Sequence, residues 1–86
     1  MYYVYLLKSK KNDRLYTGFT NDLKQRLRDH NLGKSPYTKN HRPYVLVYYE
    51  AYLSEKDART RERMLKLRSN ASAQLRKRIK QSVDEG

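Results

Sequence analysis

Apolar residues fall into short segments that predict three strands. Residues 2–8 and 15–20 are rich in aromatic and β-branched residues, and the polar stretch 10–14 between them predicts a hairpin turn. Residues 44–50 form a third segment of the same kind. We therefore expect a small antiparallel sheet.

The region between the second and third strands predicts a helix followed by a loop. Leu23 and Leu27, at positions i and i+4, define one apolar face. Thr20 or Asn21 is the predicted N-cap, and Gly33 is a typical residue just beyond a helix C-terminus. The following residues predict a basic loop that ends at a proline.

Helical signals fill the rest of the chain. Ser54 and Asp57 form a capping-box-like start for a helix that we expect to run to about Arg68. Residues 69–70 predict a break, after which Leu75 and Ile79 supply the apolar face of a final basic helix.

The predicted element order is ββαβαα, which indicates an α+β fold with a three-stranded antiparallel sheet flanked by helices. Length favours one domain, which we place at residues 1–82, with 83–86 as a frayed tail.

Charge narrows the range of partners. Twenty Lys and Arg residues against nine Asp and Glu residues give a formal charge of +11, which favours a polyanion such as nucleic acid. Cysteine is absent, which excludes disulfides and thiolate metal sites. No apolar run approaches the roughly 20 residues that cross a bilayer, and the first residues do not resemble a signal peptide. We expect a soluble, cytoplasmic protein without membrane contact.

Acidic residues are few and scattered, which argues against a two-metal nuclease. With two histidines and no cysteine, a zinc site is also disfavoured. Any hydrolysis of phosphodiesters would therefore use one metal ion or none.

Glu62 is the acidic residue with an unusual position. It shares a helical stripe with Ala58 and Leu65, where a buried carboxylate would need a partner or a metal ion. Alternatively, it lies at the surface and pairs with Lys66 at i+4. Spacing alone leaves both interpretations open.

Four other side chains are candidates for chemistry, each with a structural alternative. Tyr5 and Tyr16 lie on the two strands of the hairpin, where their hydroxyls could meet, although tyrosine is common in strands for packing reasons. Arg26 and His30 share one face of the first helix. Arg26 could instead pair with Asp22 at the surface, and a histidine such as His30, taken alone, is more often a half-exposed surface residue.

Taken together, these segments resemble the GIY-YIG nuclease domain, in particular small stand-alone bacterial members similar to the N-terminal domain of UvrC. The resemblance covers residues 2 to about 68. It departs from the family pattern at Tyr3, Val4 and Thr17, and Asn70 is a candidate for an asparagine that follows the family's catalytic glutamate. The matching segments are Tyr3-Val4-Tyr5, Tyr16-Thr17-Gly18, Leu23-x-x-Arg26-Leu27-x-x-His30-Asn31, Gly33-Lys34, Tyr37-Thr38, Arg42-Pro43, Leu46-Val47-Tyr48 and Ala58-Arg59-x-Arg61-Glu62-x-x-x-Lys66.

The resemblance implies hydrolysis of a phosphodiester by in-line attack of water with one divalent ion, Mg²⁺ or Mn²⁺. It assigns metal binding to Glu62 and the phosphate clamp to Arg26. Tyr5 and Tyr16 would position or deprotonate the water, and His30 would bond to a tyrosine or to phosphate. A free tyrosine has a pKa of about 10, so a tyrosine base needs nearby positive charge or a proton relay.

Substrate binding is assigned to basic residues of the first strand, the loop and the long helix. They are Lys8, Lys34, Lys39, Arg42, Arg59, Arg61 and Lys66. We expect a monomer that cleaves DNA, favoured over RNA, with low sequence specificity, in repair or recombination.

Three alternatives remain. The chain could be a nucleic-acid-binding module without activity, or an interaction domain recruited by a protein partner. An HNH nuclease built on residues 29–31 and 40–41 fits poorly, because its histidine should precede the metal-binding helix on a ββα unit.

Overall fold

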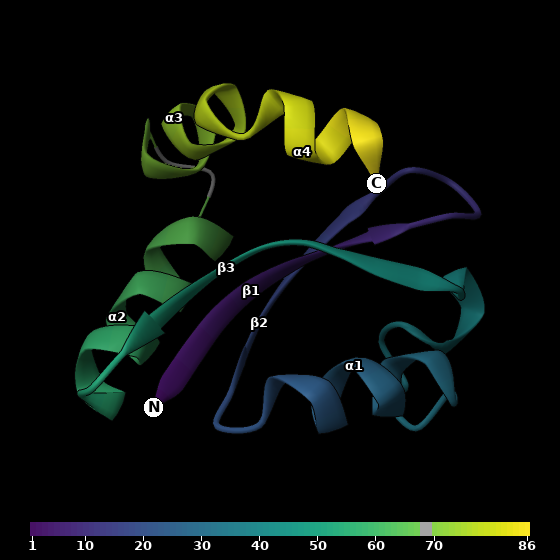
Figure 1. The fold of residues 1–86 in the computed structure, drawn as a ribbon, viewed down its shortest axis with the longest axis horizontal. Helices are drawn as coiled ribbons and strands as arrows, with labels where there is room; N and C mark the ends of the chain where they lie inside the picture. Colours follow the sequence, from purple (N-terminus) through teal and green to yellow (C-terminus); the bar gives the residue numbers. More distant parts are fainter. Residues whose placement is uncertain (68–69) are drawn as a thin grey trace.

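A three-stranded antiparallel sheet with helices on both faces forms the fold in the computed structural model, which describes residues 1–67 and 70–86 (Figure 1). The strands are β1 (Tyr2–Ser9), β2 (Leu15–Thr20) and β3 (Tyr44–Tyr52). The helices are α1 (Leu23–Asn31), α2 (Glu55–Lys66), α3 (Asn70–Arg78) and α4 (Lys80–Glu85), with a 3-10 turn at Lys39–His41. The strand order is β2-β1-β3, so β1 is central. The predicted α+β class is confirmed.

Successive side chains of β1 point to opposite faces of the sheet, and the buried core is therefore divided into two clusters, one on each face. Val4 and Leu6 point to one face, where they pack with apolar residues of α2 and α3. Tyr5 and Leu7 point to the other face, together with Tyr44 and the apolar side of α1. This period-2 alternation places the two faces in contact with different helices. Figure 1 shows α1 on the opposite side of the sheet from α3 and α4.

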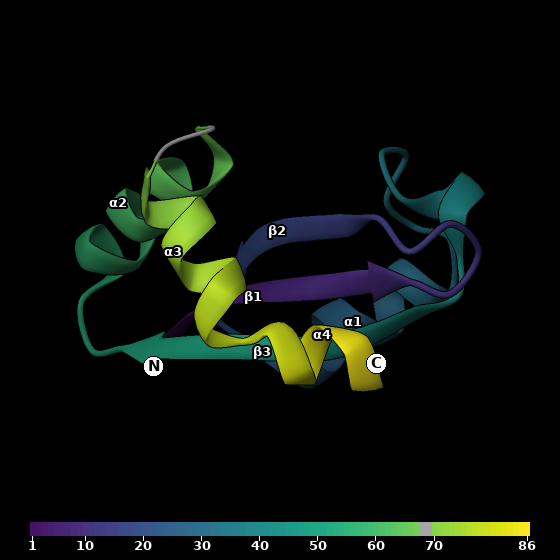
Figure 2. The ribbon, with the colours of Figure 1, turned by 90° about the horizontal axis from the view of Figure 1, so that it is seen from above.

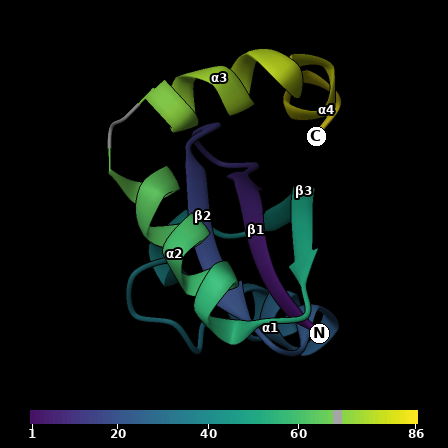
Figure 3. The same ribbon diagram turned by 90° about the vertical axis from the view of Figure 1, so that its left-hand side faces the viewer.

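The predicted apolar stripes of the helices form the core. Ala58 and Leu65 of α2 are buried, as are Leu75 and Ile79 near the end of α3. Seen from the side, α2 lies next to β2 (Figure 3). Within the described ranges, no helix is long and apolar enough to cross a membrane.

The start of α1 differs from the prediction by one or two residues. Asp22, not Thr20 or Asn21, is the N-cap, and its carboxylate accepts a hydrogen bond from the Gln25 amide at 3.1 Å. The Thr20 hydroxyl is occupied, because it accepts from the Asp22 amide at 3.0 Å. At the other end, Gly33 has a φ of +80°, the conformation that favours glycine after a helix.

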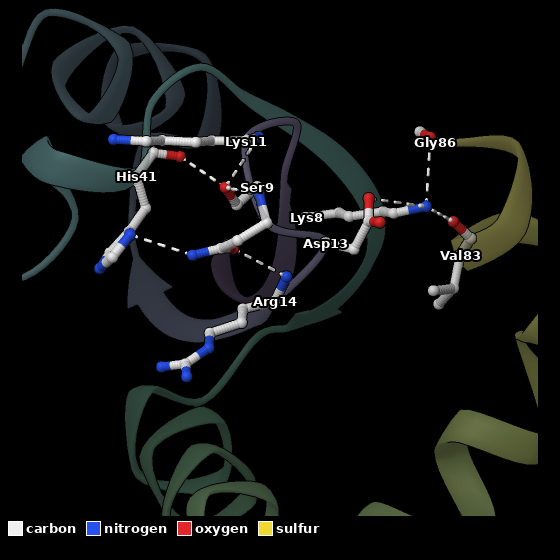
Figure 4. Close-up of polar contacts among 9 residues, drawn as sticks. Lys8, Ser9, Lys11, Asp13, Arg14, His41, Val83 and Gly86 are labelled. Atoms are coloured by element: carbon white, nitrogen blue, oxygen red, sulfur yellow. Dashed lines mark hydrogen bonds and ion pairs between the residues drawn. The ribbon is translucent and has the colours of Figure 1, made fainter.

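The hairpin turn is organised by the buried side chain of Ser9 (Figure 4). Its hydroxyl donates to the His41 carbonyl at 2.6 Å and accepts from the amides of Lys11 and Asn12. One hydroxyl thus joins the β1–β2 turn to the loop before β3.

The C-terminal segment corrects two predictions. The single final helix of the predicted ββαβαα order is divided into α3 and α4, because Ile79 leaves helical geometry and serves as the N-cap of α4. Residues 83–86, expected to be a frayed tail, instead complete α4, which lies against β3 (Figure 2). Lys8 Nζ donates to the carbonyls of Val83 at 2.8 Å and Gly86 at 3.3 Å, and so satisfies carbonyls at the end of the helix. The predicted helix end at Arg68 and the break at Ser69 lie outside the described residues.

Candidate active site

The side chain of Tyr5 crosses the neighbouring strand, β2, at a glycine. In the β1–β2 ladder Tyr5 pairs with Gly18, and a Cβ atom built on Gly18 would lie 2.2 Å from the Tyr5 hydroxyl oxygen. Any residue with a Cβ atom at position 18 would collide with the Tyr5 ring. Gly18 therefore allows the Tyr5 hydroxyl to lie over β2, and the Tyr5 side chain itself is buried.

His30, in the last turn of α1, meets Tyr5 inside the protein. Its Nε2 shares a hydrogen bond with the Tyr5 hydroxyl at 3.0 Å, and its Nδ1 shares one with the Thr38 hydroxyl at 2.7 Å. The rings of Tyr16 and Tyr44 lie 5.1 and 6.1 Å from the imidazole, centroid to centroid. His30 has no exposed surface, so of its two predicted partners it contacts a tyrosine.

Arg26, one turn before His30, faces the same hydroxyl. Burial raises the pKa of Tyr5 to about 12, although interaction with the Arg26 guanidinium acts in the opposite direction. Burial, followed by the positive charge of Arg26, lowers the pKa of His30 below its usual value. Tyr5 is therefore protonated and His30 is neutral at neutral pH. Arg26 interacts with the Tyr5 hydroxyl, and the Asp22 carboxylate, its alternative predicted partner, caps α1.

Glu62 comes from α2 and combines both of its predicted environments. Its side chain is 19% exposed, between the buried Ala58 and Leu65, and its carboxylate pairs with Lys66 at 3.0 Å. Its negative charge also raises the pKa of Tyr5, though less than burial does.

Four of the five candidate residues are linked through contacts with Tyr5 or His30: Tyr5 is bonded to His30, Arg26 interacts with the Tyr5 hydroxyl, and the Tyr16 ring lies against the His30 imidazole. Arg26, Tyr16 and Glu62 all influence the ionisation of Tyr5, which is bonded to His30. In the described part of the chain, no three His, Asp or Glu residues gather in one place. A single carboxylate suits Mg²⁺ or Mn²⁺, since such hard ions retain waters and bind phosphate oxygens.

Two of the seven predicted nucleic-acid-binding residues have their charges engaged within the fold. Lys8 is bonded to the end of the chain, and its side chain is only 12% exposed. The Arg61 guanidinium forms a two-pronged contact with the Glu50 carboxylate, with Nε and Nη2 each 2.9 Å from a carboxylate oxygen.

The other five lie at the surface. Lys34 is 3.7 Å from Asp29, Arg42 Nε donates to the Lys39 carbonyl at 2.7 Å, and Arg59 Nε lies 2.8 Å from Glu55. Exposed ion pairs such as those of Lys34 and Arg59 contribute little to stability, so these two cations can exchange a carboxylate for a phosphate at small cost.

Thr38 and Asn31 shape the site and were given no role from the sequence. The Asn31 side chain accepts from the Tyr44 amide at 2.7 Å and donates to the Tyr44 carbonyl at 3.1 Å, joining α1 to β3. Both residues lie within the segments that resemble the family motif, and this is the only feature of the sequence that could have indicated a role for them. Asn70, the candidate asparagine, is exposed at the start of α3.

Comparison with known proteins places these features in a family. Residues 1–80 match the GIY-YIG catalytic domain. The UPF0213 protein SH2523 of Staphylococcus haemolyticus is 47% identical over 66 residues, covering 76% of this chain and 79% of its own. The UPF0213 protein CPE1444 of Clostridium perfringens is 43% identical over 77 residues, covering 87% and 82%. The solution NMR structure of the UPF0213 protein BH0048 from Bacillus halodurans has a TM-score of 0.53 and 34% identity, covering 87% of this chain and 81% of that one.

Proposed function

The chain belongs to the GIY-YIG family, and on this basis we propose that it is an endonuclease that hydrolyses phosphodiester bonds with one divalent metal ion. The observation that carries the proposal is the buried hydrogen bond between Tyr5 of β1 and His30 of α1, with Arg26, one turn earlier on α1, interacting with the same tyrosine hydroxyl. A purely structural tyrosine would not need a neutral histidine and an arginine at its hydroxyl.

Arg26 is the residue that binds the scissile phosphate. Its guanidinium is partly exposed at the edge of the buried pair, where it can donate two hydrogen bonds to phosphate oxygens. Charge on these oxygens increases during attack, so a fixed cation stabilises the transition state more than the ground state.

Tyr5 and His30 move the proton of the attacking water. Because the pKa of Tyr5 is about 12, a free phenolate is rare at neutral pH. The hydroxyl instead accepts the water proton as its own proton passes to His30 Nε2, which leaves hydroxide, neutral tyrosine and imidazolium. Nε2 can accept only if Nδ1 carries the other proton and donates it to Thr38 Oγ1.

Glu62 is the ligand for the ion. An ion held by Glu62 would supply Lewis acidity for stabilising the leaving 3′-oxygen. The carboxylate must first exchange its contact with Lys66, 3.0 Å away, which releases a cation beside the substrate strand.

The substrate in this proposal is DNA with little sequence preference. Its strand would contact Lys34, Lys39, Arg42 and Arg59, all exposed, through phosphates. Phosphate contacts fix the position of a strand but carry no sequence information, which supports a general role in repair or recombination.

A second candidate, nucleic-acid binding without cleavage, is favoured by one observation. Glu62, the proposed metal ligand, is already paired with Lys66. If this ion pair persists in the complex, the site binds phosphate but does not recruit an ion.

Cleavage of supercoiled plasmid and labelled single strands, with Mg²⁺, Mn²⁺ or EDTA, separates the two candidates. Glu62→Gln keeps the shape of the side chain and removes its charge, so cleavage is expected to fall at least about a hundredfold while binding persists. The matched control is Glu85→Gln, an exposed acid on α4, which should retain full activity.

Equal cleavage by the wild type and Glu62→Gln would contradict the proposal. Absence of cleavage from both, with binding that weakens with salt, would favour the binding module.

A further inference from the structure

A hollow of about 340 Å³ is lined in part by Arg26, and the proposed chemistry gives this hollow no occupant. It is bounded by the start of β1, the end of β2 and the first turns of α1 and α2. The residues that matter for its chemistry are Tyr2, Phe19, Asn21, Arg26, Glu55 and Arg59. Its volume is at the lower end of the range for small-ligand sites, about 300–1,000 Å³.

The lining of the hollow includes flat side chains. The Tyr2 and Phe19 rings are nearly parallel, with an interplanar angle of 13° and centroids 6.2 Å apart. The Arg59 guanidinium lies over the Phe19 ring, 4.2 Å from its centroid. Aromatic rings and guanidinium planes are the surfaces on which unstacked nucleobases pack.

Polar groups at the rim match the edges of a base. Asn21 is exposed and carries both a donor and an acceptor. The Glu55 carboxylate is 2.8 Å from Arg59 Nε, so its charge is compensated while oxygen lone pairs remain available to an exocyclic amine. The hollow therefore offers stacking surfaces together with hydrogen-bonding groups of both kinds.

Arg26 joins the hollow to the candidate active site. Its guanidinium interacts with the Tyr5 hydroxyl, and the same side chain lines the hollow. A phosphate bound by Arg26 would leave the adjoining nucleotide at the mouth of the hollow. Arg59 also lines the hollow, and the two arginines give it a positive potential suited to a strand of phosphates.

We propose that this hollow binds one unstacked nucleobase, adjacent in the strand to the phosphate held by Arg26. This inference rests on the proposed function, because it takes from it the binding of the scissile phosphate by Arg26. It adds a substrate requirement, because the base must leave its stack to enter. Single strands and locally opened duplexes are therefore bound better than regular duplex, in which unstacking costs energy.

Two probes that differ only in their bases test the proposal: a short oligothymidylate and a strand of equal length made of abasic residues. Each is titrated into ¹⁵N-labelled protein in EDTA, so that no cleavage occurs. Both strands are expected to shift the Arg26 Nε signal. Only the thymidine strand should shift the signals of Phe19 and of the Asn21 side-chain amide.

Binding affinities of Arg59→Gln, with Arg63→Gln as the matched control, test the proposal quantitatively. Both residues are exposed arginines of α2, but Arg63 lies outside the hollow. Arg59→Gln should weaken binding of the thymidine strand at least about fivefold more than Arg63→Gln does, in line with the loss of one stacking contact. Arg59→Gln should weaken binding of the abasic strand much less than it weakens binding of the thymidine strand, because with the abasic strand only a phosphate contact is lost.

Equal shifts of Asn21 with both strands, no shifts with either, or equal losses in both variants would overturn the nucleobase site. The plasmid assay reports separately on the proposed function. A protein that shows the base-dependent signature without metal-dependent cleavage retains the nucleobase site and loses the nuclease.

Discussion

At the scale of single residues, the site depends on a glycine that performs no chemistry. Gly18 lets the Tyr5 ring cross β2, so that its hydroxyl reaches His30. The φ of Gly18 is not in the left-handed region, and the requirement for glycine is one of space. Packing at this point and the proposed catalysis are therefore coupled through one side chain.

Gly18→Ala is expected to displace the Tyr5 ring and separate its hydroxyl from His30. Overpacking of this kind costs about 1–3 kcal/mol of unfolding free energy, measured by urea denaturation, and cleavage should fall with it. Thr17→Ala, on the opposite face of the same strand, should cost less than about 1 kcal/mol. Equal effects of the two substitutions would contradict the role given to Gly18.

His30 predicts a pH dependence of stability. The folded protein lowers the pKa of His30, so below about pH 6.5 the unfolded chain binds a proton that the folded state resists. The free energy of unfolding should therefore decrease as pH falls from about 6.5 towards the folded pKa. Urea titrations between about pH 5 and pH 8 measure this slope, and His30→Gln should flatten it. An unchanged slope in the variant would assign the effect to other groups.

At the scale of elements, a polar cluster attaches α2 to β3. Glu50 accepts hydrogen bonds from the hydroxyls of Tyr48 and Tyr52 and from the Arg61 guanidinium. Burial alone would raise the pKa of Glu50, but these hydrogen bonds together outweigh it and hold the pKa below the usual value. Because α2 carries Glu62, this cluster also fixes the position of the proposed metal ligand.

Glu50→Gln tests the attachment of α2. Loss of charge-assisted hydrogen bonds in a half-buried position should cost about 2 kcal/mol of unfolding free energy near neutral pH. In the wild type this stabilisation is present above the ordinary carboxyl pKa and is lost as pH falls through the lowered folded pKa. Glu55→Gln, which breaks the exposed pair with Arg59, should cost only a few tenths. Similar costs for both would contradict the assignment.

At the scale of the whole molecule, the excess of positive charge predicts binding that weakens with salt. With a formal charge of +11, log K should fall linearly with log salt concentration, by about 0.7–0.9 for each phosphate contact. Lys39→Gln removes one exposed cation and should reduce the slope by about one contact. Lys8→Gln should leave the slope unchanged, because its ammonium is bonded to α4. Fluorescence anisotropy over a salt series measures both, and equal slopes for the two variants would contradict this division.

Most of the secondary structure could be predicted from local pattern. The three strands, the apolar stripes of the helices and the glycine after α1 follow from side-chain periodicity and backbone preference, which act over a few residues. The N-cap of α1 was misplaced because Thr20, Asn21 and Asp22 are all competent caps, and only their mutual hydrogen bonds select Asp22. The same limit applied to α4, whose end is satisfied by a lysine from the opposite end of the chain.

For the site, the sequence by itself determined which side chains were candidates, because motif order and helical spacing are properties of the chain. The sequence could not decide whether each candidate side chain lies in the site or in an ordinary structural or surface position. The tertiary structure placed His30 against Tyr5 and gave Glu62 both a half-buried position and a lysine partner. It also committed Arg61 to Glu50. These choices depend on distances between residues far apart in sequence, where burial and the nearest opposite charge decide what a polar group contacts.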